Sequence, residues 1–177
     1  MLRDGREVNL RLLSAADAEA VADFYAAIPD ADGIYYLPPS ARTRAKALAR
    51  AAAADDPCEV CLVLADDAGI VHGEAWYRWS AQRPERSTFG IAVRRNMQGV
   101  GAGRLLMTRL MEFGDLYGPP VMDLTVQAEN ERAWKLYASM GFVKVREQMR
   151  GQREDAPPMH EFCMERRRAA RPPIHAS

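Results

Sequence analysis

The stretch that constrains this chain most is Gln98–Gly103, a glycine-rich turn between its clearest strand pattern and its clearest helix pattern. Upstream, residues 87–93 alternate large and small side chains with β-branched character, which predicts a strand ending near Val93. Downstream, apolar residues recur at steps of three and four, which predicts a helix with one apolar stripe: Leu106, Leu110, Phe113 and Tyr117.

The turn itself has the features of an anion-binding backbone. Gly99, Gly101 and Gly103 remove the side chains that would separate a ligand from the main chain. The first N–H groups of the following helix have no internal partner and lie at the positive end of the helix dipole, so they can hold a phosphate or diphosphate. Three arginines add positive charge beside the turn: Arg94, Arg95 and Arg104. The alternative interpretation is a purely structural turn that allows close backbone packing.

Two other phosphate-binding motifs do not fit this turn. It lacks the Lys-Ser/Thr pair of a P-loop. It also lacks the first-glycine spacing of a dinucleotide-binding fingerprint, and no acidic residue follows about 20 positions later in the required strand context.

The turn and a second block together resemble the GNAT superfamily of N-acetyltransferases. Gln98–Gly103 resembles motif A, written Q/R-x-x-G-x-G/A, whose backbone amides bind the diphosphate of acetyl-CoA. Residues 130–142 match the pattern N-x-x-A-x-x-x-Y-x-x-x-G-F, with one predicted helix and one predicted strand between the blocks. The resemblance is specific from about Phe89 to Phe142. It implies an acetyl-CoA-dependent N-acetyltransferase, with acetyl-CoA as the acyl donor and no metal.

The same resemblance implies the fold. We expect one α/β domain of the GNAT type over residues 1–166, with a mixed, mainly antiparallel sheet of about seven strands and about four flanking helices. The motif A strand, its helix and the strand at 121–126 predict a right-handed parallel unit. Residues 167–177 form a basic tail that we expect to be disordered.

Several further elements follow from local patterns. Residues 8–12 predict a strand, and Ser14 with Asp17 predicts the start of a helix. Ser40 predicts the cap of a second helix, which runs to Ala54 with a solvated basic face. Residues 59–64 and 70–79 predict a β-hairpin, followed by a polar connector over residues 80–86.

The resemblance also assigns a cofactor site. The backbone of Ile91 and Val93 matches the strand positions that hold the pantetheine arm and the carbonyl oxygen. The diphosphate is expected on the amides of motif A, with Arg104 and Asn130 completing the site; the motif A positions are Gln98, Gly99, Val100, Gly101, Ala102 and Gly103. Asn130 is also a good helix N-cap, so it has two candidate roles.

Tyr137 falls on the tyrosine position of the family, where the phenol donates a hydrogen bond or a proton to the departing CoA sulfur. A phenol suits this role because its ordinary pKa near 10 keeps it protonated at neutral pH. The alternative is that Tyr137 only packs within the apolar stripe of its helix.

The match leaves the identity of the general base open. Many GNAT sequences carry a glutamate where this chain has Thr88, which cannot act as a base. Glu74 on the preceding strand is the substitute candidate, with His72 behind it, because a desolvated carboxylate can gain basicity. A chain of water molecules is the alternative.

Residues 29–39 mix turn residues with three large side chains. In the family this region lies over the acceptor site, so Tyr35 and Tyr36 are candidate substrate contacts. The alternative is a connector whose tyrosines pack on the core.

Composition excludes several classes of protein. Lys plus Arg equals Asp plus Glu at 24 each, so nothing favours nucleic acid as a partner. No apolar run reaches the length of a membrane span, and the charged start leaves no signal-peptide core, so we expect a cytoplasmic protein. Cys58 and Cys61 stand at CxxC spacing without a second pair, and three histidines are too few to favour a zinc site.

The sequence therefore predicts an enzyme that transfers an acetyl group from acetyl-CoA to a primary amine by direct attack in a ternary complex. Two rivals stay open: a non-catalytic acyl-CoA-binding module, and a transferase that uses a larger acyl-CoA. The acceptor is open between a small-molecule amine, an amino acid and a protein N-terminus. A homodimer is compatible with the predicted edge strands.

Overall fold

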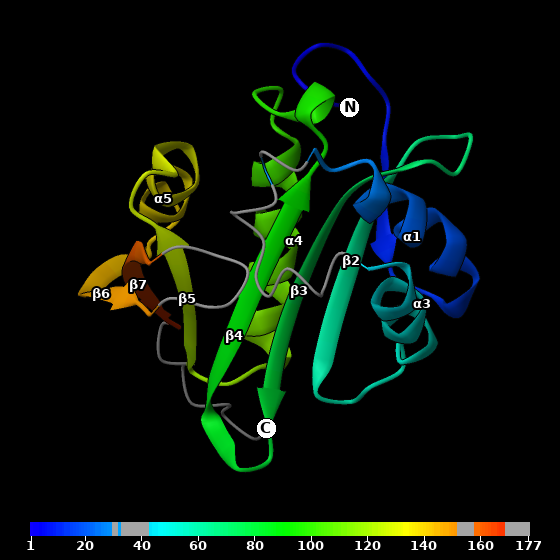
Figure 1. Ribbon diagram of the computed structural model, residues 1–177. Coiled ribbons are helices and arrows are strands. Elements are labelled where there is room, and N and C mark those ends of the chain that lie inside the picture. The colour runs from blue at the N-terminus through cyan, green and yellow to red at the C-terminus, as the bar shows by residue number, and fades with distance from the viewer. Residues whose placement is uncertain (30–31, 33–42, 152–157, 169–177) are drawn as a thin grey trace, which may run out of the picture.

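A seven-stranded mixed sheet forms the centre of the molecule (Figure 1). The computed structural model describes residues 1–29, 32, 43–151 and 158–168. The strand order is β1-β2-β3-β4-β5-β7-β6, and only β4 and β5 run parallel. The strands are β1 (Asn9–Leu12), β2 (Glu59–Ala65), β3 (Val71–Ser80), β4 (Arg83–Val93), β5 (Val121–Gln127), β6 (Val143–Arg150) and β7 (Met159–Arg167). The predicted sheet, with its single parallel crossover, is confirmed.

Helices cover both faces of the sheet. Within the described residues they are α1 (Ala18–Ala26), α3 (Arg44–Ala52), α4 (Ala102–Tyr117) and α5 (Glu131–Ser139), with two short 3-10 turns, η1 (Ala15–Asp17) and η3 (Arg95–Met97). Helices α4 and α5 contribute Leu106, Leu110 and Tyr137 to the core on one face. Helices α1 and α3 contribute Phe24 and Ala47 to a separate core on the other face. The sheet is therefore apolar on both sides.

The side chains of β3 alternate between these two cores, because successive residues of a strand point to opposite faces. Ala75 and Tyr77 are fully buried in the α4 core. Trp76 packs against the α1/α3 core, and Glu74 points to the same face. The face on which a β3 side chain lies thus decides which helices it can contact.

The parallel pairing of β4 with β5 is short. Arg86, Ser87 and Thr88 pair with Val121, Met122 and Asp123. Beyond Thr88 the two strands continue, but no further pairing between them is found in the described part of the chain. Helix α4 connects the two strands and begins just beyond the open end, so the separation lies beside the glycine-rich turn (Figure 1).

Three boundaries differ from the predictions. Helix α3 begins at Arg44 instead of Ser40, because the Thr43 side chain accepts the Lys46 amide and caps it. Most of the predicted connector 80–86 belongs to β4, since β3 and β4 form a hairpin with a tight turn. Strand β7 ends at Arg167, so the first residue of the predicted tail 167–177 belongs to the sheet, and Arg166 of this strand forms a bidentate pair with Asp115.

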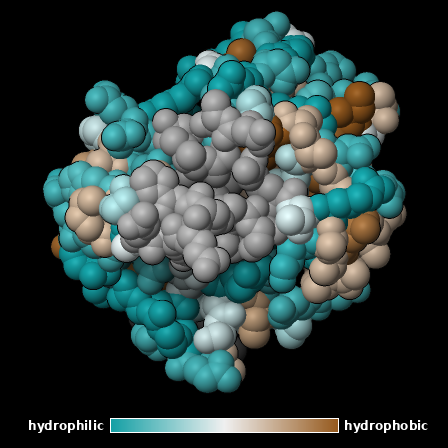
Figure 2. Space-filling model, viewed as in Figure 1, coloured by the Kyte–Doolittle hydropathy of each residue, from teal (hydrophilic) through white to brown (hydrophobic). Residues whose placement is uncertain are grey.

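The described surface is mostly hydrophilic on the face in Figure 2, with scattered hydrophobic residues. The largest exposed apolar side chains include Val143, Val145 and Met149 on the edge strand β6. Among the described residues, no helix has the length and apolar character that crossing a bilayer requires.

The turn from β1 into η1 is held by a charged capping arrangement. Asp17 accepts two hydrogen bonds from Arg11, at 2.5 and 2.6 Å, and two from the amide and hydroxyl of Ser14, both at 2.9 Å. The Arg11 guanidinium and the Ser14 donors lower the pKa of Asp17 from its ordinary value near 4 to about 2. Asp17 therefore joins the first strand to the first helical turn as a carboxylate.

This depressed pKa predicts an acid-dependent stability. A carboxylate whose folded pKa is lowered stabilises the native state above its unfolded pKa, and the contribution is lost as pH falls from about 4 towards 2. We expect Asp17→Asn to lose about 1–2 kcal/mol at pH 7 and to lose less in acid than the wild type, as measured by urea unfolding. Asp55→Asn, at an exposed loop position, is the control. Equal acid sensitivity in Asp17→Asn and wild type would contradict this account.

Candidate functional site

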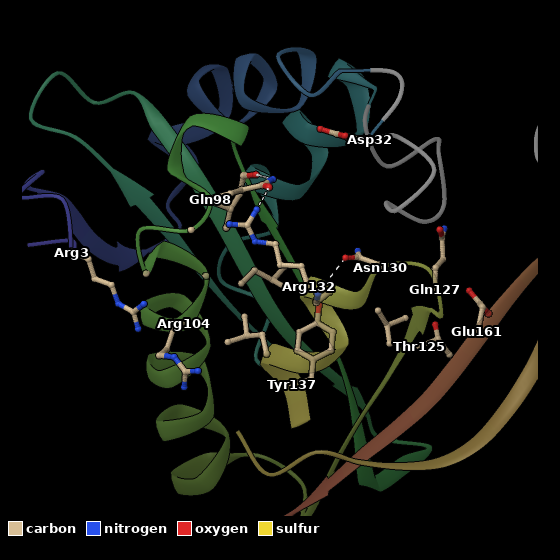
Figure 3. A pocket seen from close by; sticks show the side chains of 18 of the residues that line it. Arg3, Asp32, Gln98, Arg104, Thr125, Gln127, Asn130, Arg132, Tyr137 and Glu161 are labelled. Atoms are coloured by element: carbon tan, nitrogen blue, oxygen red, sulfur yellow. Dashed lines mark hydrogen bonds between the residues drawn. The ribbon is translucent and has the colours of Figure 1, made fainter. Parts of the chain in front are cut away.

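A pocket of about 400 Å³ opens where β4 and β5 separate (Figure 3). One wall comes from β4 and the other from β5, and residues of α4 and α5 also line the pocket. Tyr137 lines this pocket, and so do most of the predicted cofactor residues. These are Ile91, Val93, Gln98, Gly99, Gly101, Gly103, Arg104 and Asn130. The other two predicted positions, Val100 and Ala102, have side chains packed into the core.

The glycine-rich turn forms one end of this pocket. Gly99 and Gly101 have φ angles of +83° and +101°, a backbone region that side-chain-bearing residues rarely adopt. The Leu105 amide is bonded back to the Gly101 carbonyl at 2.9 Å. The amides of Ala102, Gly103 and Arg104 precede this bond and have no helical acceptor. They supply N–H donors at the positive end of α4, which suits an anionic ligand.

Gln98 connects the turn to two other elements. Its side-chain amide donates to the Val93 carbonyl at 3.1 Å, and its Oε1 accepts from Arg132 at 3.0 Å. A Cβ placed on Gly99 would lie only 2.9 Å from a terminal nitrogen of Arg132. Arg132 of α5 therefore lies directly over the turn, a placement that the sequence analysis did not predict.

Two more arginines line the same end. Arg104, on the first turn of α4, donates to the Ser139 hydroxyl at 2.9 Å. Arg3 also lines the pocket, although it belongs to the N-terminal segment, about 100 residues before Arg104 in the sequence. Figure 3 shows the side chains of Arg3 and Arg104 at one end of the site. No local pattern around Arg3 indicates this position, because it depends on tertiary contacts alone.

Tyr137 stands between the ends of the pocket. The residue is 8% exposed, and its ring packs edge-on against Phe89, with ring centroids 5.4 Å apart. The side chain points from α5 into the pocket (Figure 3). Tyr137 therefore packs within the core and also lines the pocket, so its position is compatible with both of the alternatives that the sequence leaves open.

The opposite end carries polar residues from β5, β6 and β7. Gln127 and Glu161 are register partners on neighbouring strands and are almost fully buried. Glu161 forms an ion pair with Arg150 and accepts from Gln148 at 3.1 Å. Sequence reasoning missed these residues, because their approach depends on the β5-β7-β6 pairing. Tyr35 and Tyr36, the predicted substrate contacts, lie outside the described residues.

Glu74 lies elsewhere, on the α1/α3 face of the sheet, and does not line this pocket. Its carboxylate is fully buried, 2.6 Å from Arg50 Nε and 3.1 Å from Cys61 Sγ. Arg50 is only 16% exposed and also pairs with Glu59, so the predicted solvated basic face of α3 is wrong at this position. A buried carboxylate is paired with a guanidinium because burying an unpaired charge would cost folding free energy.

The groups around Glu74 remain in their uncharged or ion-paired forms. Burial and the neighbouring Glu74 charge raise the pKa of the Cys61 thiol and of the Tyr25 phenol well above their ordinary values. Burial opposes the charge of Arg50, but the neighbouring negative groups, Glu74 first among them, together outweigh burial and raise the pKa of the guanidinium. The reserve candidate His72 bonds to Asp66 at 2.8 Å at the hairpin turn. In the described part of the chain, no group of three potential metal ligands comes together.

Comparison with known proteins agrees with this geometry. The model of the acetyltransferase (GNAT) family matches residues 21–142, more than half of the chain. This chain belongs to that family. It is therefore an acetyltransferase of the GNAT type, and the match includes both the glycine-rich turn and the Tyr137 helix. No match was found among curated protein sequences.

Solved structures share the GNAT fold over nearly the whole chain. The ribosomal-protein-S5-alanine acetyltransferase from Vibrio fischeri is 14% identical, with a TM-score of 0.79, covering 98% of this chain and 100% of its own. The yncA protein from Salmonella typhimurium, solved with its cofactor acetyl-CoA, is 20% identical, with a TM-score of 0.76 and coverages of 96% and 99%. A GNAT-family acetyltransferase from Streptococcus pneumoniae is 20% identical, with a TM-score of 0.74 and coverages of 92% and 100%. At these identities the likeness establishes the fold.

Asn130 of this GNAT enzyme can be tested for its two candidate roles. Its Oδ1 accepts from the Ala133 amide at 3.2 Å, so it caps α5, and it also lines the pocket. We expect Asn130→Ala to lower the free energy of unfolding by about 1 kcal/mol, and Asn130→Asp to retain the cap. Both variants should bind acetyl-CoA more weakly, because both lose the side-chain N–H₂ donor. Unchanged acetyl-CoA affinity in Asn130→Asp would leave capping as the only role.

Proposed function

We propose that this enzyme transfers the acetyl group of acetyl-CoA to a primary amine of a small molecule or peptide, by direct attack within a ternary complex. The observation that carries this proposal is the separation of β4 from β5 beside the glycine-rich turn. It combines unpaired strand backbone, helix N-terminal amides and a tyrosine in one pocket. The solved yncA structure, which holds acetyl-CoA on the same fold, supports the choice of donor.

Each part of the pocket has a proposed task. The amides from Gln98 to Gly103 bind the diphosphate through their N–H donors, and Arg104 adds positive charge for the phosphates of the donor. The backbone of Ile91 and Val93 lies on the free edge of β4 and binds the pantetheine arm and the thioester carbonyl oxygen. Asn130 contacts the pantetheine from the start of α5. On β4, where its pairing with β5 has ended, the proposed contacts with the donor are therefore made by main-chain groups.

Tyr137 is proposed as the proton donor to the leaving group. The amine nitrogen forms the new bond to the carbonyl carbon, the carbon–sulfur bond breaks, and the sulfur takes the Tyr137 proton. Tyr137 is buried at the centre of the pocket, where a hydrogen bond to a developing thiolate is poorly screened by water. Its proton is restored from solvent after the products leave.

The acceptor amine must lose its own proton. Glu74 lies outside the pocket and is already paired with Arg50, so we propose that water molecules carry this proton to solvent. Tyr35 and Tyr36 remain proposed acceptor contacts. The polar end at Gln127 and Glu161 lies across the pocket from Arg3 and Arg104 and is the proposed side of acceptor entry.

The first test is ligand-dependent stability. We expect acetyl-CoA and CoA, at one hundred times their dissociation constants, to stabilise the protein by about 2.7 kcal/mol in thermal unfolding, while NAD and ATP do not. A positive result would be followed by an amine screen that monitors thiol release. Binding without turnover for any amine would favour the acyl-CoA-binding module, and a preference for longer acyl chains would favour the larger-donor transferase. No stabilisation would overturn the proposal.

The second test concerns Tyr137. We expect Tyr137→Phe to lower kcat by about 10²-fold or more while acetyl-CoA affinity changes little, because the ring and its packing are retained. Tyr117→Phe, on an exposed tyrosine of α4, is the matched control and should keep wild-type activity. Retained activity in Tyr137→Phe would remove the proposed proton donor.

Glu74→Gln completes this comparison. Because Glu74 holds Arg50 and does not face the pocket, the variant should lose unfolding free energy but keep the wild-type dependence of kcat/KM on pH. A flattened pH profile would restore Glu74 as the base.

A further inference from the structure

Three arginines of the pocket differ from the arginines around them. Arg6 and Arg95 are each paired with a carboxylate, and Arg150, which lines the opposite end of the pocket, is paired with Glu161. Arg3, Arg104 and Arg132 all line the pocket, and none of them has a carboxylate partner among the described residues. This end of the pocket therefore carries uncompensated positive charge in a chain whose formal net charge is zero.

Arg3 is positioned by the short N-terminal turn that contains it. Leu2 is 6% exposed and belongs to the α4 core, so it anchors the turn. The Arg3 amide donates to the Val100 carbonyl at 3.0 Å, and Arg6 donates to the Asn96 carbonyl at 2.8 Å. The N-terminal turn is thus fixed at two points, to the glycine-rich turn at Val100 and to η3 at Asn96. Arg3 has a defined backbone position even though its side chain is exposed.

The Arg3 side chain lies along the outer edge of the glycine-rich turn. A Cβ placed on Gly101 would lie 3.6 Å from Arg3 Cγ and 3.8 Å from its Nε. Figure 3 shows Arg3 and Arg104 at the end of the pocket away from Glu161. Arg132, by contrast, is held by Gln98 over Gly99. Arg3 and Arg104 therefore lie beyond the diphosphate-binding amides.

The proposed donor, an acyl-CoA, carries one more phosphate group than the diphosphate that the amides of the turn bind. The diphosphate is assigned to the N–H groups of the turn, and Arg132 lies above them. CoA carries a further phosphate monoester on the 3′-oxygen of its ribose, and a phosphate monoester dianion prefers guanidinium groups, which it can bind through two N–H donors. Two arginines outside the diphosphate site have the charge and geometry to bind it.

We propose that Arg3, together with Arg104, binds the 3′-phosphate of CoA and makes the enzyme discriminate CoA from dephospho-CoA. The proposal rests on the proposed function, because it assumes that the pocket binds an acyl-CoA. It adds to that function a specificity-determining residue from the N-terminal turn, which neither sequence motif contains.

The test measures CoA and dephospho-CoA binding by calorimetry on the full chain. Wild type should bind CoA about tenfold more tightly than dephospho-CoA. Arg3→Ala should lose about tenfold in CoA affinity and less than twofold in dephospho-CoA affinity, so that the discrimination disappears. Arg3→Lys should keep part of it, since lysine supplies the charge without the fork of donors.

Arg146→Ala is the matched control, because Arg146 is an exposed arginine of β6 that lies outside the pocket and forms no ion pair in the described part of the chain. It removes the same charge and should keep the wild-type discrimination. Equal losses for both ligands in Arg3→Ala would mean that Arg3 supports the turn or the diphosphate, and would overturn the proposal. Unchanged affinities would also overturn it. Absence of CoA binding in wild type would instead overturn the proposed function.

Discussion

The arrangement of the site depends on the point at which β4 and β5 stop pairing. Ser87 donates to the Val121 carbonyl at 3.1 Å, and Arg86 pairs with both Asp123 and Glu165, so the closed end is held across three strands. Beyond Thr88 the free edge of β4 presents main-chain donors and acceptors that no neighbouring strand satisfies in the described part of the chain. Buried main-chain groups need partners, so an opening of this kind suits a ligand with polar groups along its length.

Two helices meet this opening with different contributions. Helix α4 offers its N-terminal amides, and α5 supplies the side chains of Asn130, Arg132 and Tyr137 within about two turns. Charge also changes along the pocket. Arginines without carboxylate partners lie at one end, and the ion-paired Glu161 lies at the other. An elongated ligand that is anionic at one end only would have a single preferred orientation in such a field.

Features that local sequence encodes could be predicted, and features that arise from tertiary contact could not. The glycine-rich turn and the cap at Asn130 each depend on neighbouring residues, and the structure has them where expected. The burial of Glu74 with Arg50 joins residues 24 positions apart, and the contact of Arg3 with the Gly101 turn joins residues 98 positions apart. No periodicity or motif reports such pairings. The residue types were visible in the sequence, but their partners were not.

The positive-φ glycines imply that positions of the glycine-rich turn differ in their tolerance to mutation. Because the proposed ligand contacts there are main-chain N–H groups, a side-chain replacement at Val100 or Ala102 leaves every donor in place and acts only through packing. At Gly99 or Gly101 a replacement strains the backbone, and at Gly99 it also collides with Arg132. Over evolutionary time, such a binding surface can drift in its amino-acid identities while keeping its shape, with the two glycines as its fixed points.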